Sequence, residues 1–284
     1  MFRLINHAGR AALVVDEQRF DLAALSGDAA LADPMTALTR HRELHDLSQR
    51  AGSVTSDGPV DPAALLAPVP KPSKVFAIGL NYREHAAESN IALAPAPMTF
   101  TKFQNSICAP SSDVALSGDA VDWEVELVVV LGDRCRNVAR DDAWNHVAGL
   151  TLGQDISDRT VQLIGAPAQF SLGKSFDTYG PIGPAVVSVD AFTDREQIGL
   201  WCDVSGRRVQ TGNTRDQIFP IPQLVSYLSS ICTLEAGDII FTGTPSGVGM
   251  ASGTFLKVGD EIVSGADTIG GFTNRCVAGS GPVL

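Results

Sequence analysis

The chain has 284 residues and a mass of 29.9 kDa, with 44% hydrophobic and 19% charged residues. These proportions are typical of a globular protein and exclude disordered, collagen-like and coiled-coil chains. The formal net charge of -11 repels nucleic-acid phosphates and anionic membrane surfaces. No apolar run reaches the roughly 18 residues of a membrane span, and the five cysteines stand singly without a CxxC spacing. We therefore expect a cytoplasmic protein with reduced thiols that binds neither nucleic acid nor membranes.

The first 70 residues are expected to form a small α/β unit. Residues 1–20 indicate two short strands, and residues 34–50 carry a helical pattern. Pro68, Pro70 and Pro72 then stiffen the chain, because proline ends helices and blocks sheet pairing. The predicted domains are therefore residues 1–70 and residues 71–284.

The larger unit is predicted to be mostly β, because short apolar runs alternate with turn signals and helical patterns are few. This spacing indicates an open or rolled sheet with helices added to it, and not a regular βαβ alternation. The predicted strands are 74–78, 125–131, 147–152, 185–189, 198–204, 238–242 and 261–263, and the predicted helices are 82–89, 158–164 and 222–231.

The first segment that could carry chemistry follows the strand predicted at 74–78. Asn81 and Glu84 have nearly the spacing of a capping box, which opens a short helix with His85 and Glu88 on one face. A carboxylate beside an imidazole fixes its tautomer and raises its basicity, as a general base requires. A histidine and a glutamate on the surface are the alternative interpretation of this pattern.

The segment DWEVELVVVL, residues 122–131, places two acidic residues in an apolar strand. Side chains alternate along a strand, so Glu124 and Glu126 point the same way with Cα atoms roughly 6.6 Å apart. The strand is apolar on both faces and is therefore predicted to be buried, where two adjacent carboxylates need a positive partner. Either a lysine or arginine, or a hard divalent cation such as Mg²⁺, Mn²⁺ or Ca²⁺, would meet this need.

Three later segments add weaker candidates. Asp155 follows an apolar strand just before a predicted helix, so it is either a cap or turn residue or a third oxygen ligand. Lys174 lies among small and apolar residues, which would desolvate it unless it is on the surface. Residues 242–249, TGTPSGVG, form either a tight turn or a loop that offers N–H and hydroxyl donors to a carboxylate.

Together these segments resemble the fumarylacetoacetate hydrolase family, in particular its branch that acts on acylpyruvates and related 2-oxo acids. The resemblance covers residues 74–277. By this resemblance we expect an α+β, mostly β fold, with a mixed β-sandwich roll as the catalytic domain, and a homodimer. The motifs that carry it are GLNY at 79–82 with His85 and Glu88, FTKF at 100–103, DWEVEL at 122–127, QD at 154–155 with Arg159 and Gln162, GKSFD at 173–177, and TGTP at 242–245 with GVG at 247–249.

The resemblance also implies roles for individual residues. The implied ligands of Mg²⁺ or Mn²⁺ are Glu124, Glu126 and Asp155, and the implied catalytic residues are His85, Glu88 and Lys174. The implied contacts to a small anionic 2-oxo acid are Arg159, Gln162, Thr244 and Lys102. Lys102 departs slightly from the pattern, because many family members have Lys-Pro where this chain has Lys102-Phe103.

The implied reaction is hydrolysis of the C3–C4 bond of a 2,4-dioxo acid, which gives a 2-oxo acid and a carboxylic acid. The cation would stabilise an enolate, His85 with Glu88 would deprotonate water, and Lys174 would offset negative charge. Decarboxylation of oxaloacetate and the tautomerisation or isomerisation of a 2-hydroxy-dienoate are rivals that need the enolate but no water. A catalytically silent member that only binds a metal and a dicarboxylate is a rival of another class. The His85 and Glu88 pair favours hydrolysis.

Overall fold

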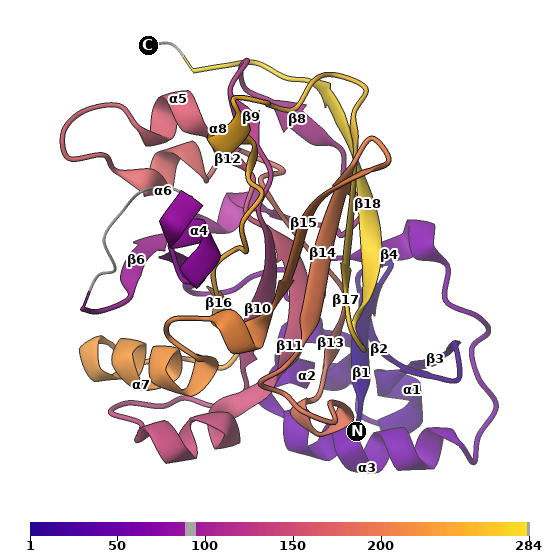
Figure 1. Ribbon diagram of the computed structural model, residues 1–284. Helices are drawn as coiled ribbons and strands as arrows, with labels where there is room; N and C mark the ends of the chain where they lie inside the picture. Colours follow the sequence, from indigo (N-terminus) through magenta and orange to yellow (C-terminus); the bar gives the residue numbers. More distant parts are fainter. Residues whose placement is uncertain (89–94, 283–284) are drawn as a thin grey trace.

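The computed structural model describes residues 1–88 and 95–282 and shows a mostly β protein with short helices (Figure 1). Two sheets pack face to face in its centre. Most helices gather at two places, one beside the N-terminus and one at the opposite upper end in Figure 1. The predicted α+β, mostly β fold is confirmed by this architecture.

The N-terminal region combines strands with three helices. Two strands around a turn were predicted over residues 1–20, and the structure adds a third strand. The elements are β1 (Arg3–His7), β2 (Arg10–Val15), β3 (Gln18–Asp21), α1 (Leu22–Ser26), α2 (Pro34–Thr39), α3 (His41–Ala51) and β4 (Leu65–Leu66). The proline-rich stretch that follows forms no helix or strand, as predicted, but Val69 within it is fully buried. This stretch is therefore packed against the protein and is not a free linker.

A mixed sheet of 11 strands runs through the whole molecule, with the order β3-β2-β1-β13-β11-β10-β16-β5-β6; β4 pairs with β1 and β7 with β13. Its further strands are β5 (Val75–Gly79), β6 (Met98–Thr101), β7 (Ile107–Cys108), β10 (Val125–Leu131), β11 (Val147–Gln154), β13 (Gly180–Val187) and β16 (Ile239–Phe241). The N-terminal strands belong to this sheet, because β1 pairs antiparallel with β13 and sets Arg3 opposite Val187. Strand pairing thus connects the two predicted domains. The domain boundary at residue 70 stays a prediction.

A second sheet of five strands has the order β15-β14-β17-β18-β8, and one short pair of strands lies apart from both sheets. The second sheet comprises β8 (Val114–Leu116), β14 (Gly199–Val204), β15 (Arg207–Asn213), β17 (Glu261–Ala266) and β18 (Gly270–Ala278), and the short pair is β9 (Val121–Asp122) with β12 (Ser157–Asp158). The short pair places residue 122 beside residue 157, close to the ends of β10 and β11.

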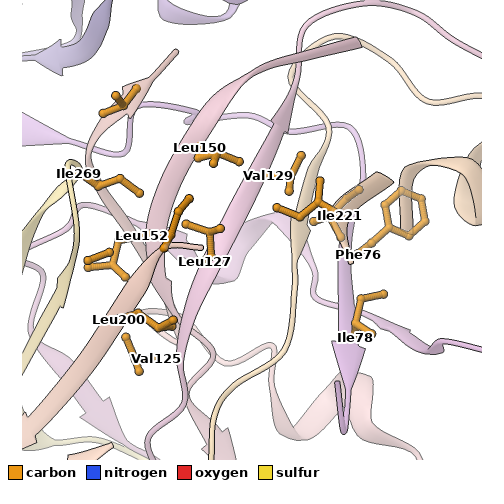
Figure 2. Packing of buried hydrophobic residues seen from close by; sticks show 14 of the residues in the cluster. Phe76, Ile78, Val125, Leu127, Val129, Leu150, Leu152, Leu200, Ile221 and Ile269 are labelled. Atoms are coloured by element: carbon orange, nitrogen blue, oxygen red, sulfur yellow. The ribbon is translucent and has the colours of Figure 1, made fainter. Parts of the chain in front are cut away.

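Strand β10 is buried on both faces, as its sequence predicted. Leu127 and Val129 join the core between the two sheets, where they lie near Leu150 and Leu152 of β11 and Leu200 of β14 (Figure 2). The residues that alternate with them, Val128 and Val130, pack in a second core together with Leu38 and Leu44 of the N-terminal helices. By the same alternation, the face that bears these two valines also bears the two glutamates.

Four of the remaining helices are short and gather at the upper left of Figure 1, whereas the longer helix Ile221–Ile231 lies below them and packs against the 3-10 helix Arg140–His146. The remaining helices are α4 (Arg83–Glu88), α5 (Arg159–Gln162), α6 (Phe170–Gly173), α7 (Ile221–Ile231) and α8 (Gly249–Ser252), with 3-10 helices at Ala29–Ala32, Pro62–Ala64, Gln104–Ser106, Arg140–His146, Val189–Ala191 and Thr214–Asp216. The helix predicted at 82–89 begins one residue later, and Ser89 lies outside the described residues. In the described part of the chain, every helix is too short or too polar to cross a membrane.

Candidate active site

Three carboxylates from two adjacent strands converge where β10 begins and β11 ends. Glu126 lies in β10, Glu124 comes just before it, and Asp155 follows β11. The antiparallel register sets Val125 opposite Gln154, and the Asp155 N–H donates to the Glu124 carbonyl at 2.9 Å. All three side chains are buried, and one oxygen of each lies within 4.8 Å of the others. The structure therefore brings together the three predicted metal ligands.

Two buried lysines lie directly against these carboxylates. The Lys174 Nζ donates to Glu124 Oε2 and Asp155 Oδ2 at 2.7 Å and to Ser157 Oγ at 2.8 Å. The Lys102 Nζ donates to Asp155 Oδ1 at 2.8 Å and to the carbonyl of Lys174. Burial lowers the pKa of Lys102, and the attraction of Asp155 only partly opposes this. Both lysines therefore help to hold Asp155 in place.

Arg159 supplies the third positive charge, and Glu126 receives none. The Arg159 Nη2 donates to Glu124 Oε1 at 2.7 Å. The hydrogen bond to Glu126 comes from the Gly243 N–H at 2.7 Å, and no lysine or arginine pairs with Glu126 among the residues that the structure describes. The sequence left open whether a basic residue or a metal would neutralise the two glutamates. The structure shows basic partners for Glu124 and leaves Glu126 uncompensated.

As a result, the pKa values of the two glutamates are shifted in opposite directions. Burial alone would raise the pKa of Glu124, but Lys174 and Arg159 outweigh it and lower the pKa to about 2. Burial raises the pKa of Glu126 well above its ordinary value, and the neighbouring Asp155 and Glu124 carboxylates raise it further. Burial opposes the charged form of Lys174, yet Asp155 and Glu124 raise its pKa overall. A cation beside Glu126 would relieve the repulsion among the three carboxylates.

His85 and Glu88 lie one turn apart on α4 and contact each other. The His85 Nδ1 is 3.3 Å from Glu88 Oε2. The Gly247 N–H donates to both oxygens of Glu88 at 3.2 and 3.3 Å, and the Trp123 indole N–H donates to the Gly247 carbonyl at 3.0 Å. The loop before α8 thus holds the carboxylate that orients the imidazole.

A small cavity of about 90 Å³ joins the imidazole to the carboxylates. Its polar lining consists of His85, Glu124, Glu126, Arg159, Gln162, Lys174 and Thr244, and its other lining residues are Ile78, Gly79, Leu80, Phe100, Leu163, Phe170 and Met250. The three other predicted site residues, Glu88, Lys102 and Asp155, do not line it within the described part of the chain. Lys102 lies behind Asp155, so the structure does not place it where it would touch a small molecule in the cavity.

The family sequence model described as fumarylacetoacetate (FAA) hydrolase C-terminal matches residues 74–277. This range is most of the chain and includes every residue of this site. The chain belongs to the fumarylacetoacetate hydrolase family. One member of the family, the human mitochondrial oxaloacetate tautomerase FAHD2A, is 38% identical over 257 residues, which cover 88% of this chain and 82% of the human protein.

Solved structures of family members have the same fold. A Mycobacterium smegmatis protein with the provisional name HpcE is 41% identical, with a TM-score of 0.89 over 97% of this chain and 99% of that one. The maleylpyruvate hydrolase of Sphingobium sp. SYK-6 was solved in complex with manganese(II) and pyruvate. It is 29% identical, with a TM-score of 0.82 over 98% of this chain and 100% of that one. The relatives of this chain thus include a tautomerase and a hydrolase.

In this structure the proton of the Thr244 hydroxyl is already engaged in a hydrogen bond. Its Oγ1 donates to the Val125 carbonyl at 2.8 Å and accepts from Gln210 Nε2 at 2.7 Å. A hydroxyl has a single proton, so Thr244 can only accept a further hydrogen bond through this group. The Gln210 Oε1 in turn accepts from the Val125 N–H at 3.0 Å, so Gln210 joins the second sheet to the site.

Sequence reasoning assigned no role to Asp122, Gln154 or Gln210. Asp122 has the same strand parity as Glu124 and Glu126, so alternation alone could have placed it on their face. Gln154 lies in a motif that was noted, and its Oε1 accepts the Glu124 N–H at 2.9 Å. Gln210 carries no local signal, because its partners lie 34 and 85 residues away in the chain.

Proposed function

We propose that the protein is a cation-dependent enzyme that interconverts the keto and enol forms of a small 2-oxo acid of the oxaloacetate type. The observation that carries this proposal is the position of His85, which lines the cavity beside Glu124 and Glu126 while its Nδ1 contacts Glu88. A base at this point can transfer a proton to or from a bound acid. The small cavity favours a short substrate, and the name of the human relative supports the tautomerase reaction.

The donor set fits a hard divalent cation. Glu124, Glu126 and Asp155 offer only carboxylate oxygens, which suit Mg²⁺ or Mn²⁺ better than softer metals. The Glu126 carboxylate is buried beside two others without a basic partner, so the described residues leave one negative charge to be neutralised. When bound, such an ion would act as a Lewis acid on the oxygens of the 2-oxo acid.

The side chains around the cavity divide the work of proton transfer. Glu88 accepts from the imidazole Nδ1–H, which leaves Nε2 of His85 as the atom that takes the proton from C3 of the keto acid. The electron pair of the C–H bond forms the C2–C3 double bond while the π pair of the C2 carbonyl moves to its oxygen, and His85 then returns the proton to that oxygen. Arg159 and Gln162 on α5 would orient the substrate carboxylates, and Lys174 would offset the developing charge.

Hydrolysis of an acylpyruvate is the second candidate, and the maleylpyruvate hydrolase with bound pyruvate favours it. In this reaction His85 takes its proton from water, and the hydroxide adds to C4. The C3–C4 bond then breaks, its electron pair and one proton go to C3, and a 2-oxo acid and a carboxylic acid leave. The same dyad serves both reactions, so the substrate decides between them.

A substrate panel tests the two candidates directly. Oxaloacetate is followed in D₂O for exchange at C3, for enol decay and for release of pyruvate by decarboxylation. Several acylpyruvates and a 2-hydroxy-dienoate are followed for loss of substrate, each with Mg²⁺, Mn²⁺ or EDTA. We expect fast exchange on oxaloacetate with a cation, and no pyruvate above the uncatalysed rate. Fast cleavage of an acylpyruvate with slow exchange would replace the tautomerase by the hydrolase.

His85→Ala shows whether the imidazole is the base. The variant should lose on the order of 10²- to 10⁴-fold in activity, the usual contribution of general base catalysis. The matched control is His45→Ala, which removes a partly exposed histidine from α3, outside the cavity. His45→Ala should keep the activity of the parent protein. Full activity in His85→Ala would exclude the proposed role, whichever substrate the panel selects.

A further inference from the structure

Asp122 is a fully buried carboxylate that accepts hydrogen bonds from both sides of the site. Backbone N–H groups donate to it from Trp123 at 2.8 Å, Gly249 at 2.7 Å and Met250 at 2.9 Å. The Arg159 Nε and Nη2 donate to its Oδ2 at 2.9 and 2.7 Å. Asp122 therefore joins the start of α8 to the guanidinium on α5.

Arg159 is shared unequally between two acidic residues. It gives Asp122 two N–H groups and gives Glu124 one. Its Nη1 donates instead to Gln162 Oε1 at 2.8 Å. Without the Asp122 carboxylate, the guanidinium would have Glu124 as its one acidic partner in the described structure, and it would compete with a cation for that side chain.

Among the buried charged side chains around the cavity, the acidic residues outnumber the basic ones by one. Three cations face four carboxylates, so the group carries one excess negative charge when all its members are ionised. Its members are Lys102, Lys174, Arg159, Asp122, Glu124, Glu126 and Asp155. With a neutral side chain at position 122 the charges balance, and the net attraction for a divalent ion is weakened.

We propose that Asp122 is a positioning residue of the cation site: it holds Arg159 and provides the excess negative charge that lets Glu124 bind a metal. The proposal rests on the cation site of Glu124, Glu126 and Asp155 proposed above. Asp122 is not a ligand in this arrangement, because its oxygens are already occupied by five donors. Partners behind the ligands of metal sites commonly control affinity in this way.

Direct titration with Mn²⁺ tests the proposal without an activity assay. Calorimetry on the parent protein and on Asp122→Asn should show binding weakened on the order of 10- to 100-fold in the variant. The matched control is Asp238→Asn. Asp238 is also fully buried, pairs with Lys74 Nζ at 2.9 Å and accepts the backbone N–H of Glu235 at 2.8 Å, but contacts none of the seven charged residues. Its variant should bind Mn²⁺ as the parent protein does.

A double variant distinguishes the effect of the Asp122 charge on Mn²⁺ affinity from any effect of Asp122 on the local fold. Asp122→Asn with Arg159→Gln restores the excess of one negative charge, so Mn²⁺ affinity should return to within a few-fold of the parent protein. If Asp122 only supports the local fold, the double variant should bind as weakly as the single one or worse, and the proposal would be overturned. Where Asp122→Asn does not fold, the double variant alone decides by the same criterion.

The titration also distinguishes the two proposals. If the parent protein binds no Mn²⁺, the cation site itself is wrong and the role of Asp122 falls with it. If the parent protein binds Mn²⁺ and Asp122→Asn binds it equally well, the cation site stands and only the role of Asp122 is overturned.

Discussion

Glu84 and Glu88 lie one turn apart on α4 but differ in what their carboxylates contact. Glu88 contacts His85 and the Gly247 N–H, whereas Glu84 is exposed and lies 3.2 Å from the Ser246 hydroxyl. If His85 takes a proton as proposed, Glu88 is placed to stabilise the imidazolium, and Glu84 is not.

Glu88→Gln should lower kcat on the order of 10²-fold or more, because a neutral amide does not stabilise the imidazolium. Glu84→Gln, on the same helix, is the control and should retain activity. Steady-state kinetics on the substrate selected by the panel measures both. The double variant His85→Ala, Glu88→Gln should be little worse than either single variant, since residues that act as a unit are not additive. Additive losses would show that the two side chains act separately.

The sequence predicted residues that the structure brings together, but it did not predict which of them pair with one another, line the cavity or lie behind it. Alternation along one strand placed Glu124 and Glu126 on the same face. That Lys102 lies behind Asp155 while Lys174 faces the cavity depends on contacts between segments about 50 residues apart. No local pattern carries such information.

The element that positions Glu88 is the loop before α8, and it depends on a glycine. Gly247 has φ of +100°, and a Cβ there would lie 2.0 Å from the Val209 carbonyl oxygen. Gly253, just after α8, also has a positive φ, of +66°, but a Cβ there would meet nothing within 4 Å. An L-residue at either position would have a strained backbone, but only at position 247 would its Cβ also clash with a neighbouring atom.

Gly247→Ala should destabilise the fold by more than Gly253→Ala, whose cost is about 1–2 kcal/mol for an L-residue in this conformation. It should also lower activity, because displacement of the loop removes the N–H that holds Glu88. Urea unfolding and kcat on both variants provide the measurement. Equal stability and activity in the two variants would contradict the proposed role of the loop.

Helix α3 carries a pH-sensitive contact with the sheet. His41 is buried against Gly132, and burial lowers its pKa below the ordinary 6.5, although Asp133 partly opposes this. The folded protein therefore prefers neutral His41, while the unfolded chain takes up a proton near pH 6.5. This contribution to stability is complete above pH 6.5 and is lost as the pH falls toward the folded-state pKa.

His41→Gln should reduce the dependence of stability on pH between pH 7 and pH 5. One histidine contributes at most about 1.4 kcal/mol per pH unit in this window. Urea unfolding at several pH values gives the slope for the parent and the variant, and the difference between the slopes is the quantity of interest. Identical slopes would show that His41 does not titrate differently on folding.

Strands were predictable where apolar residues alternate or run together. The limits of β10 were predicted correctly, because every residue of Val125–Leu131 except Glu126 is apolar. The first half of β13 was not predicted, because Gly180–Pro184 is rich in glycine and proline. Strand β18 was not predicted because the buried Asn274 interrupts its alternation; its amide donates to the carbonyls of Pro110 and Ser112.

At the scale of the whole molecule, exposed apolar side chains gather around one surface hollow. Phe103, Ile164 and Leu172 all line it, and their exposed fractions are 51%, 52% and 62%. Large apolar patches of this kind mark association sites in many proteins. The homodimer expected from the sequence stays a prediction, and this surface is where we expect its contact.

Sedimentation at micromolar concentration should therefore show twice the mass of the 29.9 kDa chain. Leu172→Glu should shift the equilibrium toward the monomer, because a charge at the contact must be desolvated. Val258→Glu replaces a similarly exposed residue (65%) that does not line this hollow and should leave the dimer intact. A parent protein that sediments only as a single chain would refute the prediction.

The pairing of β1 with β13 also governs the order of events during synthesis. Arg3 leaves the ribosome about 180 residues before its partner Val187. At 5–20 residues per second the nascent N-terminal segment waits about 10–40 s for the strand that completes its sheet. During this interval the part of β1 that pairs with β13 has an open edge, and until β10 is synthesised the apolar side chains of the N-terminal helices also lack the valines that later cover them. The risk of misfolding is therefore concentrated in the first two thirds of translation.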